Sequence, residues 1–260
     1  MKIDWMAPLW ILILIGGGVG HAHGQNRTLR VLAYNIYHGE GMDKKVDLPR
    51  LAKVIRSTNP DLVALQEVDH KNRRTGMVDQ TAELAKLTGM HGRFGRQIDF
   101  MGGQYGQAVL SRFPLGESTI HILPGEPVRE TRIAFAVVIK DPSGEISFVS
   151  THLHHNNKLF REQQAAKLNE IFENASRPVI LAGDLNANPD SKPLEILQKG
   201  WKNATSGKEL RTYPSQNPKN QIDYVLVRPM DKFRVLETRV IPEEMASDHR
   251  PILAVLELAP

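Results

Sequence analysis

The sequence predicts a single α/β (α+β) domain whose sheets are largely antiparallel or mixed. Apolar, β-rich runs alternate with helical segments along most of the chain. Many consecutive strands have no helix between them, whereas parallel neighbours need such a crossover, so a purely doubly wound sheet is not expected. No repeat, low-complexity tract or linker divides the chain, and its 260 residues suit one domain with a large core.

Periodicity and boundary residues predict the elements in order. A buried strand at 29–38 precedes a helix at 46–60, which ends at a proline. A second buried strand covers 61–68, and a helix at 79–89 is closed by a glycine. Helices are also expected at 158–176 and 192–200, and strands at 107–114, 132–140, 146–153, 178–186, 222–229, 233–241 and 251–258.

The N-terminus has the order of a secretory signal peptide. Residues 1–24 begin with one lysine, continue through an apolar stretch and end in small residues, with cleavage expected near Gly24 and Gln25. The apolar run is shorter than the roughly 20 residues that span a bilayer. We therefore expect a signal peptide at 1–24, the domain at 25–260, a secreted or periplasmic protein and no stable membrane span. A retained N-terminal anchor is the alternative.

The composition restricts the chemistry. It is typical of a soluble globular protein, with 41% hydrophobic and 24% charged residues. The chain has no cysteine, which excludes disulfides, a cysteine nucleophile and a zinc–thiolate site. The formal net charge of +4 is compatible with an anionic substrate, but lysine and arginine are spread along the chain instead of forming a block.

Polar side chains recur where the apolar strands begin or end. These residues are Asn35, Glu67, His152, Asp184, Asn186, Asp223, Asp248 and His249. Buried charges are unfavourable unless they are paired or bind metal, so convergence of these strand ends would create one anionic, histidine-containing pocket.

Such a pocket suits metal-assisted hydrolysis of a phosphoester. Mg²⁺ (or Mn²⁺) prefers carboxylate and amide oxygens, which Glu67, Asn35 and an aspartate would supply. His249 is the candidate general base, provided that a carboxylate fixes its tautomer. Asn186 can donate a hydrogen bond to a phosphate oxygen and so stabilise developing charge.

Six short blocks resemble one known family. In order, the chain contains "YNIYHG", "LQEV", "VSTHL", "GDLNA", "IDYVLV" and "SDHRP", which are similar to blocks of the endonuclease/exonuclease/phosphatase family. That family includes apurinic endonucleases, pancreatic-type deoxyribonucleases, inositol-polyphosphate phosphatases and neutral sphingomyelinases. The resemblance covers about residues 29–258. It implies a four-layer α/β/β/α sandwich of two packed sheets with outer helices, and a metal-dependent phosphoesterase.

The resemblance also implies roles for the metal-binding and basic groups. Glu67 looks like the main metal-binding carboxylate, with Asn35 beside it and Asp248 helping to hold the metal. His249 is similar to the catalytic histidine of the family, oriented by Asp223.

Three more residues match positions that bind water or phosphate. Asp184 and Asn186 resemble the pair that positions the attacking water and the phosphate, although the same residues could form only an Asx turn. His152 matches a second histidine that contacts phosphate in many members of the family.

Five further side chains are candidate substrate contacts: Arg132, Arg73, Arg74, Tyr105 and His155. Arginine geometry suits a phosphate oxygen, but a surface ion pair with Glu130 is the alternative for Arg132. The basic loop 69–80 directly follows the Glu67 strand, so Arg73 and Arg74 are expected at the pocket mouth or as solvated charges.

Several interpretations stay open. The substrate could be a nucleic acid, a phospholipid or a small phosphate ester, although no long insertion supplies apolar loops for a lipid. One rival is a non-catalytic phosphate- or partner-binding protein on the same fold. Another is a zinc hydrolase of the metallo-β-lactamase type that uses "HLHHN" at 152–156, where that family's aspartate is missing. A monomer is expected.

Overall fold

The computed structural model describes residues 27–126, 130–207 and 210–259, together with Met1. The predicted signal peptide therefore lies outside the described residues, apart from its first methionine. Among the described residues, no helix is long and apolar enough to cross a membrane.

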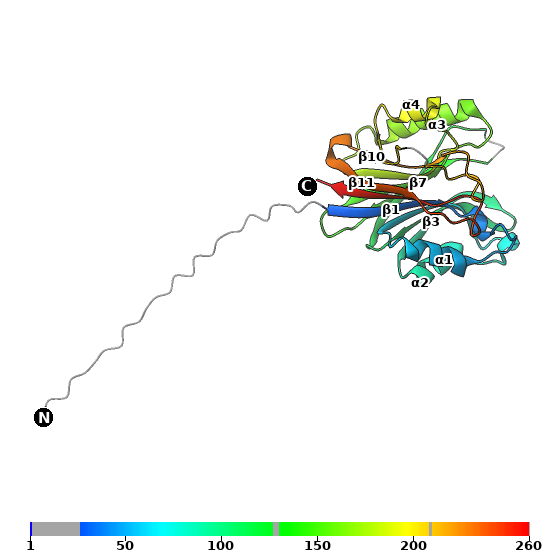
Figure 1. Ribbon diagram of the computed structural model, residues 1–260, viewed down its shortest axis with the longest axis horizontal. Coiled ribbons are helices and arrows are strands. Elements are labelled where there is room, and N and C mark those ends of the chain that lie inside the picture. The colour runs from blue at the N-terminus through cyan, green and yellow to red at the C-terminus, as the bar shows by residue number, and fades with distance from the viewer. Residues whose placement is uncertain (2–26, 127–129, 208–209, 260) are drawn as a thin grey trace.

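Two six-stranded sheets pack face to face (Figure 1). The first sheet has the order β11 (Phe233–Val240), β12 (Ile252–Leu258), β1 (Arg27–Asn35), β2 (Leu62–His70), β4 (Gly103–Ser111), β3 (His91–Phe100). The second sheet has the order β5 (Leu115–Ile122), β6 (Ile133–Ile139), β7 (Ile146–His152), β8 (Val179–Asp184), β10 (Asp223–Arg228), β9 (Lys202–Asn203).

Helices cover the outer face of each sheet and complete four layers. Helices α1 (Leu48–Ser57) and α2 (Gln80–Thr88) lie on the first sheet, and α3 (Lys158–Phe172) and α4 (Lys192–Leu197) lie on the second (Figure 1). The pairs β1–β2 and β7–β8 are parallel, and each is connected through a helix, whereas the other described strand pairs are antiparallel. The predicted four-layer sandwich with mixed sheets is confirmed.

Alternation along the strands explains the layers. On β1, Val31 and Ala33 face the core between the sheets, while Leu32 and Tyr34 face the core beneath α1 and α2. Strands buried on both faces read as continuous apolar runs, which is why the central strands could be predicted from the sequence.

The strand register brings the predicted polar residues to one end of the sandwich. Asn35 pairs with Gln66 across β1 and β2, and Asp184 on β8 lies between His152 on β7 and Asp223 on β10. The polar strand ends therefore meet where the two sheets face each other.

Three strands were not predicted. β3 and β5 are edge strands whose side chains are mostly exposed, and β9 has only two residues. Their sequences lack the apolar alternation that marks a half-buried strand, because little of their surface packs against a core. The first strand is also shorter than predicted: it ends at Asn35, and a 3₁₀ turn, η1 (Tyr37–Gly39), follows.

Candidate active site

Two site residues have a backbone conformation that side chains rarely adopt. Glu67 has φ 58° within β2, where the pairing with β4 shifts between Leu65 and Val68, and Asn186 has φ 48° just after β8. The bulge turns Glu67 out of the regular alternation of the strand. A non-glycine residue at positive φ is strained by about 1 kcal/mol, and such strain clusters at functional sites.

Asn35 connects the two sheets at the centre of the site. Its Nδ2 donates to Glu67 Oε1 at 3.0 Å and to Asp184 Oδ2 at 3.2 Å. Its Oδ1 accepts from the Tyr37 amide at 3.1 Å, and its carbonyl accepts from Ser247 Oγ at 2.7 Å. With every polar group of Asn35 engaged, the amide has one orientation and holds both carboxylates in place.

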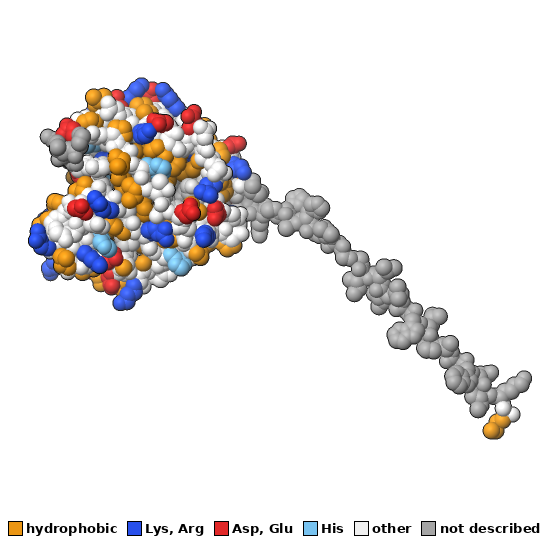
Figure 2. Space-filling model, turned by 180° about the vertical axis from the view of Figure 1, so that it is seen from behind, with side chains coloured by type: hydrophobic (Ala, Val, Ile, Leu, Met, Phe, Trp, Pro, Cys, Tyr) orange, Lys and Arg blue, Asp and Glu red, His pale blue; other side chains and the backbone are white. Residues whose placement is uncertain are grey.

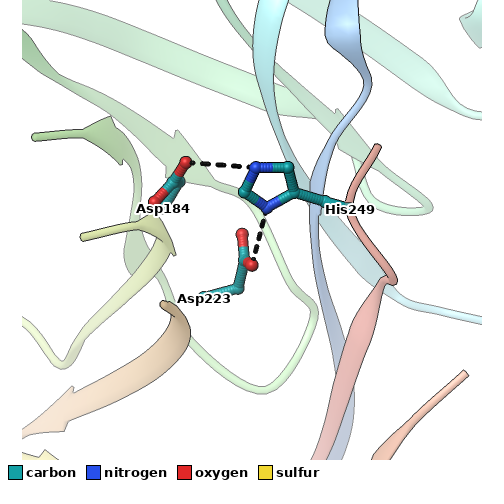
Figure 3. Close-up of side chains that lie close together, drawn as sticks. All are labelled: Asp184, Asp223 and His249. Atoms are coloured by element: carbon teal, nitrogen blue, oxygen red, sulfur yellow. Dashed lines mark hydrogen bonds and ion pairs between the residues drawn. The ribbon is translucent and has the colours of Figure 1, made fainter. Parts of the chain in front are cut away.

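His249 lies between two buried aspartates (Figure 3). Its Nδ1 is 2.9 Å from Asp223 Oδ2, and its Nε2 is 3.7 Å from Asp184 Oδ2. The ring is 4% exposed, and the two aspartates are each 1% exposed. Because one ring nitrogen is hydrogen-bonded to Asp223, the other is oriented toward Asp184 and the pocket.

Burial and mutual repulsion shift the pKa values of these groups. Burial raises the pKa of Asp184 to about 7, with a further contribution from Asp223. Burial alone would lower the pKa of His249, but the neighbouring carboxylates, Asp223 foremost, raise it to about 10. Burial also raises the pKa values of Glu67 and Asp248. The site therefore concentrates negative charge that a cation would stabilise.

The donor set fits a hard divalent cation. Four carboxylates and one carboxamide converge here: Glu67, Asp184, Asp223, Asp248 and Asn35. Asp184, Asp223 and His249 offer ligand atoms within 4.8 Å of one another, so this buried group could bind a metal. Oxygen donors in excess match Mg²⁺, Mn²⁺ or Ca²⁺ better than zinc.

The lining of the pocket also includes basic residues, Arg132, His152 and His155, which we call the basic wall. The pocket has a volume of about 460 Å³, and Arg132, His152, His155 and Tyr105 line it together with the acidic residues. His152 Nε2 is 3.4 Å from Asp184 Oδ2. Burial, reinforced by the charge of Arg132, holds the pKa of His152 well below its usual range, so its imidazole is neutral. The pocket therefore combines carboxylates with groups that can bind a phosphate.

Arg132 is buried, and the ion pair with Glu130 that the alternative predicted is formed, although the guanidinium is not at the surface. It is 2% exposed, and its Nη2 contacts Glu130 Oε2 and His155 Nδ1, each at 3.2 Å. Its Nε and Nη1 have no hydrogen-bond partner among the described residues. A buried guanidinium with unused donors in a pocket is suited to an anion.

Two predicted substrate contacts lie outside the pocket. Arg74 forms a two-point ion pair with Asp69, which is fully buried, through bonds of 2.8 and 2.9 Å. Arg73 is exposed, and its guanidinium lies against Gly102. Both arginines were placed at the mouth because their loop follows the Glu67 strand, but this loop folds back onto the β3–β4 turn.

The two interpretations of Asp184 and Asn186 are compatible. The Asn186 amide donates to Asp184 Oδ1 at 2.8 Å, so the Asx turn is present, while Asp184 Oδ2 faces His152 and Asn35. The Asn186 side-chain Nδ2 donates to the Leu153 carbonyl at 3.1 Å. The turn therefore fixes the carboxylate without removing it from the pocket.

Two residues in contact with His249 were not singled out by the sequence. The Tyr213 ring lies 4.8 Å from the His249 ring, and Ser247 Oγ accepts from the His249 amide at 3.2 Å. Tyr213 belongs to an irregular loop, "RTYPSQNPKN", which has no periodicity to mark it. The serine could have been recognised, because it directly precedes the Asp248–His249 pair.

The chain belongs to the endonuclease/exonuclease/phosphatase family, whose sequence model matches residues 32–249. Its members are phosphoesterase hydrolases that generally depend on divalent metals, so the chain is a phosphoesterase. This membership confirms the expected family and replaces the zinc-hydrolase alternative.

Similar proteins cover nearly the whole chain. The uncharacterized protein YbhP of Escherichia coli K12 is 26% identical over 250 residues, which are 90% of this chain and 98% of YbhP. An endonuclease/exonuclease/phosphatase structure from Beutenbergia cavernae has a TM-score of 0.73 and 26% identity, covering 90% of this chain and 72% of that one. The mannosyl-6-phosphatase Bt3783 of Bacteroides thetaiotaomicron, with a TM-score of 0.69, 20% identity and coverage of 88% and 99%, shares the fold.

Proposed function

We propose that this protein is an exported Mg²⁺- or Mn²⁺-dependent hydrolase of phosphoesters that uses a water activated by His249. The observation that carries this proposal is the placement of His249 between Asp223 and Asp184, 2.9 and 3.7 Å away. An imidazole fixed by one carboxylate and facing another across a small gap is the arrangement needed to orient and deprotonate a water.

Glu67, Asp248 and Asn35 are the residues that would hold the metal. Their oxygens are the hard donors that Mg²⁺ prefers, and Asp223 is already engaged with His249. When bound, the cation supplies charge neutralisation for the phosphate and the leaving oxygen. Neutralisation of Asp248 would also remove part of the field that raises the pKa of His249. The imidazole could then accept a proton near neutral pH.

The chain's own groups account for the proton transfer. Asp223 holds the proton on Nδ1, which leaves Nε2 free to accept one from the water. Asp184 lies within reach of the same water. As the water oxygen bonds to phosphorus, the bond to the leaving oxygen breaks, and the water's proton moves to His249 Nε2.

The basic wall would hold the non-bridging oxygens of the phosphate. The unused donors of Arg132 are available for an anion, and neutral His152 can donate a hydrogen bond without repelling the general base. Asn186 also lines the pocket. These contacts would strengthen as charge develops on the oxygens in the transition state.

Turnover of a phosphodiester with and without metal tests the proposal. We expect hydrolysis of bis-p-nitrophenyl phosphate with Mg²⁺ or Mn²⁺, and loss of it with a chelator or in His249→Ala. His91→Ala, which alters an exposed histidine of β3, is the matched control and should keep full activity. Plasmid and abasic DNA, RNA, inositol phosphates and sphingomyelin complete the panel and identify the substrate class. Metal-independent turnover, or turnover retained in His249→Ala, would contradict the mechanism.

Metal binding can be measured without turnover. We expect Mg²⁺ or Mn²⁺ to raise the unfolding temperature of the wild type, because a ligand that binds only the folded state stabilises it. The rise should be absent in Glu67→Gln. An equal rise in both proteins would mean that the cation binds elsewhere.

Export is tested separately. The mature protein recovered from outside the cytoplasm should begin at Gln25, near the predicted cleavage site. Recovery of only the full-length chain from the cytoplasm would refute this part of the proposal.

A further inference from the structure

A cluster of exposed apolar side chains lies beside the pocket on two loops that touch each other. Met77 and Val78 lie in the loop after β2, Phe100 is the last residue of β3, and Met101 begins the β3–β4 turn. Their exposed fractions are 52, 38, 39 and 45%. The Arg73 amide donates to the Met101 carbonyl at 3.2 Å, which fastens one loop to the other. We call these four residues the apolar patch. Met77, Phe100 and Met101 line the same groove. Single exposed apolar residues are ordinary, but several around one groove indicate an interaction surface.

Both methionines have a backbone conformation that their residue type disfavours. Met101 and Gly102, with φ 46° and 82°, form the two-residue turn between β3 and β4. A turn with positive φ at both positions favours Asn-Gly or Asp-Gly. Met77, at φ 63°, also occupies a left-handed position where asparagine or glycine is preferred. Methionine at these two exposed positions does not stabilise the local backbone. We therefore attribute its presence to what the side chains bind.

Exposed cations lie beside the apolar patch. A groove of about 690 Å³ runs along it and is lined by Lys71, Met77, Phe100 and Met101 among others. Lys71 and Arg73 are both exposed beside it, while the nearby Asp99 is paired with Arg96 at 3.2 Å. The lower half of Figure 2, which carries the first sheet with α1 and α2, shows basic, acidic and hydrophobic side chains interspersed. Apolar side chains next to cations match a bilayer surface, in which anionic headgroups cover an apolar interior.

The apolar patch is continuous with the catalytic pocket. The Arg74 guanidinium stacks over the Phe100 ring at 5.0 Å and over the Tyr105 ring at 5.5 Å. The Phe100 and Tyr105 rings are 6.4 Å apart, and Tyr105 lines the pocket. A partner bound at the apolar patch would therefore present its phosphoesters close to His249.

We propose that the apolar patch docks this enzyme onto anionic phospholipid bilayers, with Met77 and Met101 inserted at the level of the headgroups. The proposal rests on the proposed function only in that the pocket would act on a phosphoester held at that surface. A nucleic acid is the less suitable partner, because the side chains at the two tips, Met77 and Met101, are aliphatic and offer no ring on which a base could stack.

A site-specific fluorophore tests the insertion. The chain has no cysteine, so Met101→Cys can be labelled alone with an environment-sensitive dye. Met230→Cys is the matched control, because Met230 is also 45% exposed but belongs to η3 (Met230–Lys232), beyond the end of β10 that is remote from Asp223. With vesicles of phosphatidylcholine and phosphatidylglycerol, the emission should shift to the blue at position 101 and stay unchanged at 230. No shift at 101, or equal shifts at both positions, would overturn the proposal.

Substitution by asparagine separates docking from folding. Asparagine suits positive φ, so Met77→Asn/Met101→Asn should fold as well as the wild type while it loses both apolar side chains. We expect its affinity for the anionic vesicles, measured by co-sedimentation, to fall at least about tenfold. Met230→Asn should bind as the wild type does. Retained vesicle binding by the double variant would refute docking, as would a response at position 101 to single-stranded oligonucleotide alone.

The failure of docking and the failure of catalysis are distinguishable. Turnover of the soluble bis-p-nitrophenyl phosphate should be equal in the double variant and the wild type, because neither methionine lines the catalytic pocket. If vesicle binding requires the methionines but no phosphoester is cleaved, docking stands and the proposed function fails. If a phosphoester is cleaved but the wild type does not bind the vesicles, the proposed function stands and docking fails.

Discussion

At the scale of single residues, the proposed chemistry depends on the hydrogen bond between Asp223 and His249. Asp223 is 1% exposed, one of its oxygens is 2.9 Å from His249 Nδ1, and its other oxygen has no hydrogen-bond partner among the described residues. The aspartate therefore does little for the fold except to orient the imidazole. A residue of this kind can be altered with a small effect on stability and a large effect on rate.

We expect Asp223→Asn to lower kcat by about 10²–10⁴-fold and to leave KM nearly unchanged. The amide has the same shape but no longer fixes the proton on Nδ1, so Nε2 is not held in its basic form. Steady-state kinetics with bis-p-nitrophenyl phosphate measure the effect, with Asp231→Asn on exposed η3 as the control. A variant that keeps its folding and wild-type kcat would show that another group activates the water.

At the scale of elements, the ion pair of Arg74 with Asp69 holds the end of β2 against the loop that follows it. Asp69 is fully buried, and Thr75 Oγ1 also donates to it at 3.0 Å. Arg74 belongs to the 3₁₀ turn η2 (Arg73–Thr75), and its guanidinium stacks on Phe100 of β3. One arginine therefore ties β2, η2 and β3 together beside the Glu67 bulge.

We expect Arg74→Met to destabilise the protein by about 3 kcal/mol, because it leaves a buried carboxylate without its cation. Arg74→Lys should recover only part of this, since an ammonium group cannot make the two-point contact. Denaturant unfolding measures both variants. The matched control is Arg96→Met, which removes an exposed ion pair with Asp99 and should change the stability by less than about 0.5 kcal/mol. Equal losses in Arg74→Met and Arg96→Met would contradict this role.

At the scale of the whole molecule, the two sheets are in close contact at Gly95. A Cβ on Gly95 of β3 would lie 2.4 Å from Phe135 Cγ, on β6 of the other sheet. Next to this contact, Gln97 Nε2 donates to Glu130 Oε1 at 2.7 Å, and Glu130 pairs with Arg132 in the pocket. The contact between the sheets therefore keeps Gln97 next to Glu130, and Glu130 in turn holds Arg132 in the pocket.

We expect Gly95→Ala to destabilise the protein by about 1–3 kcal/mol, because the methyl group would force the Phe135 ring and the sheets apart. Gly125→Ala is the control: a Cβ at Gly125 meets nothing within 4 Å, so its stability should be close to that of the wild type. Thermal unfolding compares the two. If Gly95→Ala is as stable as Gly125→Ala, the sheets are not in close contact there.

The central strands and the acidic side of the site could be predicted because local pattern and chemistry coincide there. Strands 61–68 and 178–186 are apolar runs with Glu67 and Asp184 near their ends. The abrupt change from apolar to acidic residues can be recognised from the sequence alone. The edge strands β3 and β5 had no such signal, because their exposed side chains are not selected for burial.

The sequence by itself determined the α/β class, the family and the residue types of the pocket, because these follow from local periodicity and from motifs that survive in linear order. Only the tertiary structure decided that Arg132 is buried with unused donors, that Arg74 is engaged by Asp69, and that Met77 and Met101 line one groove. Each of these facts depends on segments distant in the chain being brought together. Whether a charge is paired or an apolar side chain is exposed is a property of its spatial neighbours.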